Sequence, residues 1–202
     1  IQPNDTSLDI ELLISQATTV TAHFTEVLNP EEALYYWHFN TLLTPSDVVT
    51  IPADYSVTAN LPLMTYTGSG PRDIDANNNG SILNIHFNQN SGKAARVRNP
   101  SDGRSVVFDL PTTGYKDIKF AYAVQRTNDG QLNNSISYSI DGTNFIQTGL
   151  TQTSFGVNTE FTLVQLDFSS ILAVNNNQNF KIKIIFVGNT TGENGNNRLD
   201  NV

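Results

Sequence analysis

The sequence predicts an all-β protein built as a two-sheet antiparallel β-sandwich, with the strand pattern of a jelly roll. Extended runs of alternating apolar and polar residues recur through most of the 202 residues, whereas helical periodicity is nearly absent. Short segments rich in Asn, Asp and Gly separate these runs, as is typical of turns. Because each run has one apolar face, two sheets packed face to face are needed to bury those faces.

The clearest alternation lies in the second half of the chain. One helical turn is expected near residues 169–172, and Arg198–Val202 reads as a further strand. Asp129-Gly130 and Asp141-Gly142 lie between strand-like runs, which predicts β-hairpins. The six alternating runs are 81–87 (Leu83, Ile85 and Phe87 on one face), 104–110, 117–126, 135–140, 161–168 and 180–187.

The first third of the chain is less regular. Two short strand-like runs, 8–14 and 19–27, end at a break around Pro30, which cannot donate to a β-ladder. We therefore expect residues 1–30 to be the end of a small preceding β-module and residues 31–202 to form the sandwich. Residues 33–40 read as its first strand, and the four prolines of residues 44–71 predict a long loop. Both ends of the sequence are expected to be cut from a longer precursor, with the sandwich truncated at its C-terminal strand.

Composition and charge narrow the classes of partner. The net charge of −8 and pI near 4.6 argue against nucleic acid and against anionic membranes, which both require clustered Lys and Arg. No segment approaches the roughly 20 apolar residues of a membrane span, so membrane insertion is not expected. The chain has no Cys and therefore no disulfide. An acidic surface suits calcium or a neutral ligand, and it also serves solubility.

No recognisable set of catalytic residues is present. The chain has only three histidines, and neither a zinc-protease motif nor a nucleophile elbow nor a phosphate-binding loop occurs. Most acidic residues lie beside turn residues, where an Asp side chain accepts backbone hydrogen bonds, so a structural role accounts for their presence. A carboxylate pair far apart in sequence, as in glycoside hydrolases, stays open. Catalysis is therefore the minority interpretation.

Two groups of oxygen-bearing side chains are candidate structural calcium ligands. Asp75, Asn77 and Asn79 match the first half of a calcium-binding loop, although the twelfth position is His86 instead of an acid. Asn40 and Asp200 form the second candidate, because the first and last strands of a jelly roll can run side by side. An Asn-rich turn explains the first group equally, and an ion pair with Arg198 or a turn cap explains Asp200.

Basic and aromatic residues supply the candidate ligand contacts. Arg96, Arg98 and Arg104 surround a turn in a chain poor in basic residues, so they could clamp a carboxylate, a sulfate or a sugar hydroxyl. They could instead be structural, paired with Asp73, Asp75 or Asp109. Trp37, Tyr35 and Phe39 share one face and read as core. Tyr36 and Tyr115, with Tyr55 and Tyr66, are expected to be more exposed and could contact the apolar face of a sugar.

Four segments carry a resemblance to a known module: 35–40, 94–100, 137–145 and the closing Arg-Leu-Asp-Asn-Val of 198–202. They resemble a module of large secreted proteins of Bacteroidota, especially flavobacteria, which are commonly exported by the type IX system, over roughly residues 31–202. The closing run resembles the last strand of many jelly-roll modules in such proteins, including carbohydrate-binding ones, and residues 18–27 resemble the last strands of an internalin-type B repeat. The resemblance implies an extracellular or outer-surface setting beside other modules of the same polypeptide, often nucleases, polysaccharide-degrading enzymes or adhesins.

These observations favour a non-catalytic accessory module that binds a polysaccharide or cell-surface glycan. A structural or adhesive spacer without a small ligand is the alternative from another class. A polysaccharide hydrolase domain with an unrecognised carboxylate pair is the third.

Overall fold

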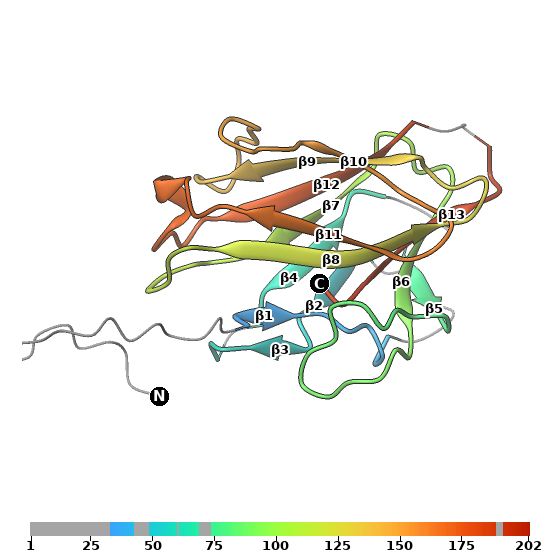
Figure 1. Cartoon of the computed structure of the whole chain (residues 1–202), viewed down its shortest axis with the longest axis horizontal. Helices are drawn as coiled ribbons and strands as arrows, with labels where there is room; N and C mark the ends of the chain where they lie inside the picture. The colour runs from blue at the N-terminus through green and yellow to red at the C-terminus, as the bar shows by residue number, and fades with distance from the viewer. Residues whose placement is uncertain (1–32, 43–48, 60, 69–73, 189–191) are drawn as a thin grey trace, which may run out of the picture. The chain divides into compact units, whose positions relative to one another are not determined.

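The computed structural model describes residues 33–42, 49–59, 61–68, 74–188 and 192–202 (Figure 1). The predicted module at residues 1–30 and its two strand-like runs lie outside the described residues, as does Asp73. The description below concerns one compact unit, Ala33–Val202. Within the described residues, no helix combines the length and the apolar character that crossing a bilayer requires.

Two antiparallel sheets pack face to face, which confirms the predicted all-β sandwich (Figure 1). The five-stranded sheet has the order β11 (Thr162–Asp167), β8 (Lys119–Arg126), β13 (Asn196–Asp200), β6 (Ala94–Arg98), β5 (Asp75–Asn77). The six-stranded sheet has the order β10 (Ser154–Gly156), β9 (Asn133–Ser139), β12 (Lys181–Val187), β7 (Ser105–Asp109), β4 (Leu63–Tyr66), β2 (Thr50–Pro52). From β6 to β9 successive strands alternate between the sheets, as in a jelly roll. Strands β1 (Tyr35–Tyr36) and β3 (Tyr55–Ser56) form a separate pair, and a 3-10 turn, η1 (Leu172–Val174), lies close to the predicted helical turn.

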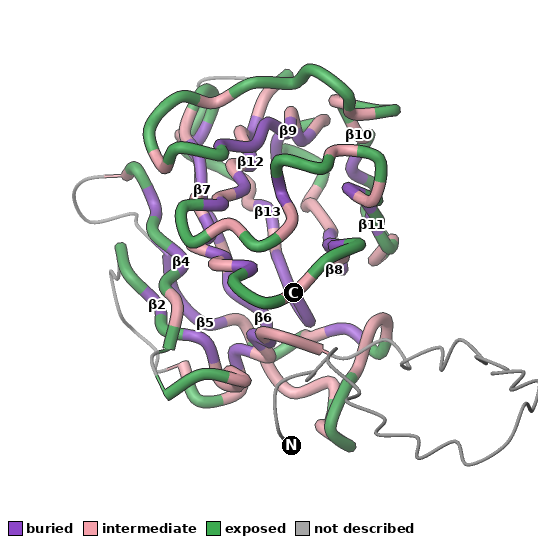
Figure 2. The backbone as a smooth tube through the Cα atoms, turned by 90° about the vertical axis from the view of Figure 1, so that its left-hand side faces the viewer, coloured by how far each residue is buried: buried purple, intermediate pink, exposed green. Residues whose placement is uncertain are grey.

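The core lies between the two sheets, where the purple segments of Figure 2 gather. The alternation in β7, β8 and β12 puts its apolar residues inward as predicted, for example Phe108, Tyr122 and Ile184, each with no exposed surface. Trp37 is buried as predicted and packs edge-on against Phe108, with ring centroids 5.2 Å apart. Burying each such side chain contributes about 1.5–3 kcal/mol, so these contacts dominate the stability of the sandwich.

The strand predicted at residues 81–87 is wrong. This segment is a series of turns, with Asn84, Phe87 and Asn88 at φ of 57°, 53° and 55°. Its backbone is held by side chains instead of a neighbouring strand. Asn201 Nδ2 donates to the carbonyl oxygens of Ser81 (2.9 Å) and Leu83 (3.0 Å), and the backbone N–H groups of Ser81 and His86 donate to side-chain oxygens. Because these bonds replace a ladder, the two-residue alternation is lost, and Phe87 is 49% exposed instead of buried.

The outcome of the other local predictions depends on which strands the sheets bring together. Residues 44–71 contain β2, β3 and β4, and Pro52 is tolerated because β2 lies at a sheet edge. Asp141-Gly142 turns β9 back on itself as predicted, through a bridge between Tyr138 and Ile146. Asp129-Gly130 does not close a hairpin, because β8 and β9 belong to different sheets. The residues of a turn therefore predict where the chain reverses, but they do not determine whether the two flanking strands pair with each other.

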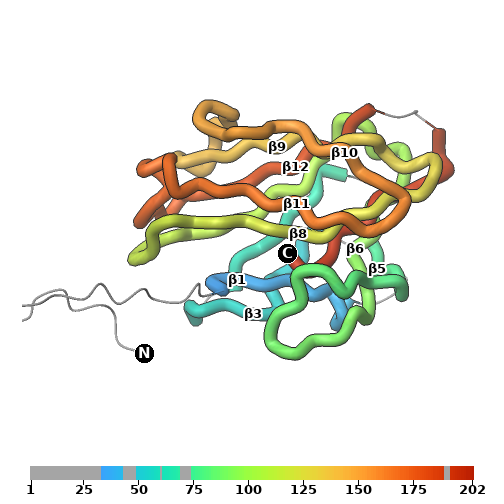
Figure 3. The backbone as a smooth tube through the Cα atoms, in the orientation of Figure 1, coloured from blue at the N-terminus to red at the C-terminus, as the bar shows by residue number. Residues whose placement is uncertain are grey.

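The two ends of the described unit meet. Trp37 N donates to the Val202 carbonyl at 3.0 Å and Val202 N donates to the Trp37 carbonyl at 3.1 Å, beside the C terminus marked in Figure 3. Strand β1 itself pairs with β3, and β13 pairs with β6 and β8, so the first and last segments of this unit meet only at the Trp37–Val202 contact, just beyond these strands. This pairing carries the end of β13 to the segment that contains Asn40.

Candidate functional site

A buried carboxylate lies at the end of β13. Asp200 has no exposed surface, and its oxygens accept hydrogen bonds only from the backbone N–H groups of Ser81 (2.5 Å) and Asn201 (2.9 Å) among the described residues. The predicted alternative of an ion pair with Arg198 is not formed. Burial raises the pKa of Asp200 to about 7, and the nearby Asp54 carboxylate acts in the same direction. The charge of Asp200 is therefore left without compensation by a described cation.

Two glycines bring further oxygens to this carboxylate. Gly80 N donates to the Gly92 carbonyl at 3.2 Å. A Cβ added to Gly80 would overlap the Ser91 carbonyl oxygen and lie 2.8 Å from Asp200 Oδ2, whereas one added to Gly92 would overlap Asn40 Oδ1. Asn40 and Asp200, paired by the sequence analysis, therefore flank the same glycine contact.

The oxygens at this contact suit a hard cation. One carboxylate, an amide oxygen and a backbone carbonyl are the ligand types that calcium takes. Asn40 Oδ1 also accepts a hydrogen bond from Lys93 N at 2.6 Å. In the part of the chain that the structure describes, no three His, Asp or Glu side chains gather to hold a metal, so any site here depends on amide and backbone oxygens.

The other calcium candidate has a different arrangement. Asp75 is 1% exposed and forms a bidentate ion pair with Arg96, with Nε and Nη2 each 2.7 Å from its oxygens, and a further ion pair with Arg98. Asn77 Oδ1 accepts from Asn79 N at 3.0 Å, which is a local turn. The oxygens of Asp75 are therefore taken up by guanidinium groups, the structural role considered for these arginines.

The predicted group of three arginines divides between the sheets. Arg104 precedes β7 in the six-stranded sheet, and its Nη1 lies 3.5 Å from the Tyr66 hydroxyl. Arg96 and Arg98 are on β6, where Arg96 pairs in register with Arg198 of β13. We refer to Arg96, Arg98 and Arg198 as the arginine row.

The arginine row continues across the outer face of the five-stranded sheet. Arg198 lies opposite Gln125 of β8, and its Nη1 donates to Gln125 Oε1 at 2.7 Å. Its Nε lies 3.3 Å from Asn196 Oδ1. The row therefore presents guanidinium and amide groups from β6, β13 and β8 on one face.

The two tyrosines proposed as ligand contacts are less exposed than predicted. Tyr36 is 1% exposed, and its hydroxyl donates to Asn201 Oδ1 at 2.5 Å, so the prediction of an exposed Tyr36 is wrong. The β1–β3 pair and the turns of residues 81–93 enclose it. Tyr115 is half-buried and packs against the core, which leaves its ring only partly available to a ligand.

An exposed aromatic side chain lies directly above Tyr36. The Phe87 ring is 4.2 Å from the Tyr55 ring and 5.7 Å from the Tyr36 ring, centroid to centroid. The His86 ring approaches Tyr36 edge-on at 5.5 Å. We call Tyr36, Tyr55, His86 and Phe87 the aromatic loop cluster. Buried Tyr36 and partly buried Tyr55 support the outer two side chains, so the exposed Phe87 ring offers a supported apolar surface with His86 beside it.

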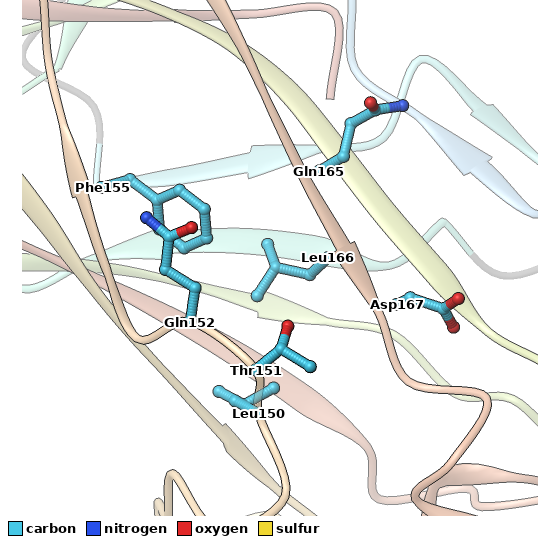
Figure 4. Close-up of a pocket in the computed structure, with 7 residues that line it drawn as sticks. All are labelled: Leu150, Thr151, Gln152, Phe155, Gln165, Leu166 and Asp167. Atoms are coloured by element: carbon cyan, nitrogen blue, oxygen red, sulfur yellow. The ribbon is translucent and has the colours of Figure 1, made fainter.

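A small depression lies where the edge strands β10 and β11 meet (Figure 4). Its volume of about 50 Å³ is far below the roughly 300 Å³ of a small-molecule pocket, so it does not enclose a sugar ring. Its lining residues are Leu150, Thr151, Gln152, Phe155, Gln165, Leu166 and Asp167.

No protein-family model matches the chain, and neither does any curated protein sequence. Among solved structures, the xylan-binding domain of carbohydrate-binding family 22 aligns at 14% identity with a TM-score of 0.42, covering 85% of this chain and 94% of that one. The N-terminal cellulose-binding domain of Cellulomonas fimi β-1,4-glucanase C aligns at 10% identity with a TM-score of 0.36, covering 66% and 95%. The family 22 and glycoside hydrolase family 10 modules of a Clostridium thermocellum xylanase, complexed with xylohexaose, align at 14% identity with a TM-score of 0.38, covering 68% and 25%.

Sequence reasoning missed two residues of these surfaces. The alternation of Leu83, Ile85 and Phe87 predicts a core face for Phe87, whereas the segment folds as turns and exposes it. The sequence suggests Arg198 only as an ion-pair partner of Asp200, and not as a member of the arginine row. Its two-residue spacing from Asp200 could have placed both side chains on the same sheet face.

Proposed function

We propose that this chain is a non-catalytic carbohydrate-binding module of a secreted or cell-surface bacterial protein, with a polysaccharide as its ligand. The resemblance to type IX-exported Bacteroidota proteins supports the extracellular setting, in which other modules of the same polypeptide carry any enzymatic activity. The aromatic loop cluster is the observation on which the ligand class depends.

The aromatic loop cluster combines the two chemistries that a sugar requires. The 49% exposed ring of Phe87 offers an apolar surface for the C–H face of a pyranose. His86 and Asn88, both exposed beside it, offer hydrogen-bonding groups for hydroxyls. A Phe at φ of 53° is a strained conformation, which costs about 1–3 kcal/mol and concentrates at ligand sites.

A substitution of Phe87 tests this proposal. In affinity electrophoresis against plant and marine polysaccharides, F87A is expected to weaken retention about tenfold, the effect of losing roughly 1.4 kcal/mol of contact. L172A is the matched control, because Leu172 is 76% exposed and lies in η1, outside the aromatic loop cluster. Equal retention of F87A and L172A would contradict the site, and no retention of the native chain by any polysaccharide would favour the spacer.

We also propose that calcium binds structurally at Asn40 and Asp200, with the Ser91 carbonyl oxygen as a further ligand. A buried carboxylate without a described cationic partner supports it, as do the two glycines that leave room for the oxygens. A ligand bound only by the folded state raises the melting temperature. Calcium is therefore expected to raise the Tm of the native chain relative to EDTA and to leave that of D200N unchanged; an EDTA-insensitive native chain would contradict the site.

A further inference from the structure

The arginine row gathers positive charge on one face of a protein whose net charge is negative. Arg96, Arg98 and Arg198 bring three guanidinium groups to the outer face of the five-stranded sheet, and Asp75 is the only carboxylate with which they pair among the described residues. The side chains of Arg96 and Arg98 are 26% and 30% exposed. The row is therefore open to solvent and locally positive, although the whole chain carries a net charge of −8.

Several donors of the row are not used within the described residues. Arg98 Nε is buried without a hydrogen-bond acceptor, so only the outer guanidinium nitrogens of Arg98 face the solvent side. Arg198 bonds only to the neutral oxygens of Gln125 and Asn196 among the described side chains. A guanidinium group has five N–H donors in a planar fork, so an anion with two oxygens can be bound by the remaining ones.

Structural pairing explains only part of this arrangement. Asp75 neutralises one charge, and the remaining like charges repel one another across adjacent strands. Burial lowers the pKa of Arg96 and of Arg198, and for Arg198 the neighbouring Arg96 charge adds to the effect. Such an arrangement costs stability, and proteins retain such costs where a function depends on them.

We propose that the arginine row binds an acidic group of the polysaccharide, either a uronate carboxylate or a sulfate ester, so that the ligand class is an anionic polysaccharide. This inference rests on the proposed carbohydrate-binding function and specifies its ligand. Both groups match the fork of an Arg side chain in a bidentate geometry. At physiological salt, charges farther than about 8 Å are largely screened. An anion at the row therefore interacts mainly with the positive charge of the three arginines, and only weakly with negative charges elsewhere on the surface.

The test first compares cellulose derivatives that share one backbone and differ in their charged groups, and then compares acidic and neutral polymers with other backbones. The native chain is run in affinity gels that contain hydroxyethyl cellulose, carboxymethyl cellulose or cellulose sulfate, and then polygalacturonate, carrageenan or arabinoxylan. We expect the acidic polymers to retain it more strongly than the neutral ones, and the carboxylate and sulfate gels identify which group is preferred. Retention by the acidic polymers should fall as salt rises.

Variants assign the effect to the row. R198Q is expected to weaken retention by the acidic polymers about tenfold and to leave the Tm unchanged or higher. K116Q removes the same charge from a side chain that is 80% exposed elsewhere, and should bind as the native chain does. R198K keeps the charge but lacks the planar fork, so its retention by the acidic polymers should lie between those of the native chain and R198Q. It also tests the row if R198Q folds poorly.

The outcomes separate the inference from the proposed function. Retention by neutral polymers with none by acidic ones, or equal loss in R198Q and K116Q, would overturn the anionic specificity alone. A native chain that no polymer retains, neutral or acidic, would overturn the carbohydrate-binding function itself.

Discussion

Asp200 shows how one residue can couple stability to its surroundings. Its pKa in the folded protein, about 7, lies above the ordinary 3.8 because the carboxyl is buried. Between these two values the folded state keeps a proton that the unfolded state has released. The stabilising contribution is therefore complete below pH 4 and is lost as the pH rises through 7.

The pH dependence of stability follows from this difference. In EDTA, the free energy of unfolding of the native chain should be higher near pH 4.5 than near pH 8, by at most roughly 4 kcal/mol at about 1.4 kcal/mol for each unit of pKa. D200N cannot ionise and should flatten this difference, as measured by urea denaturation at both pH values. An equally steep pH profile in D200N would assign the effect to another group.

At the scale of the element, one buried hydrogen bond joins the two sheets through the core. Asn134 Nδ2 of β9 donates to the Tyr122 hydroxyl of β8 at 3.0 Å, and both residues lack exposed surface. Burial raises the pKa of Tyr122, so the hydroxyl stays neutral. The bond links β8 of one sheet to β9 of the other within the shared core.

A double-mutant cycle measures this bond. Y122F leaves the Asn134 amide unpaired and should cost about 1–3 kcal/mol in the free energy of unfolding, because an unsatisfied buried donor loses its solvation. N134L with Y122F removes both partners and should recover part of that loss. If the double variant loses more free energy of unfolding than the two single variants lose together, side-chain shape and not hydrogen bonding determines which residues fit here.

At the scale of the whole molecule, Trp37 links segments far apart in the chain. Its ring packs on Phe108, its Nε1 donates to the Ile51 carbonyl at 3.2 Å, and its backbone pairs with Val202. It therefore contacts the six-stranded sheet and the end of β13 at once.

The single Trp consequently reports on cooperative unfolding. Trp37 fluorescence and far-UV circular dichroism should give coincident denaturation curves if the unit Ala33–Val202, which contains the single Trp, unfolds in a two-state transition. W37A should lower the free energy of unfolding by about 3–5 kcal/mol, the cost of a large cavity in a packed core. A fluorescence transition that precedes the loss of circular dichroism would show that the Trp37–Val202 junction opens separately.

The predictable part of the molecule is the part governed by local periodicity. Strands β7, β8, β9, β11 and β12 were visible because alternating side chains must bury one face. Asp141-Gly142 was recognisable as a hairpin because its turn needs only neighbouring residues, with Asp141 accepting the N–H groups of Thr143 and Asn144 at 2.8 and 2.7 Å. The contact between Trp37 and Val202 brings together the two segments that jelly-roll topology predicts to be neighbours, although β1 pairs with β3.

By itself, then, the amino-acid order determined the fold class, the inward faces of the long strands and the pairing of Asn40 with Asp200 as a candidate ion site. Tertiary structure alone decided that side chains, Asn201 among them, hold residues 81–87 as turns and leave Phe87 exposed. It also decided that Arg198 joins Arg96 while Arg104 belongs to the other sheet. The physical reason is the range of the interactions. Side-chain alternation acts between neighbours, whereas these hydrogen bonds and registers join residues about 100 positions apart and exist only once the sheets have formed.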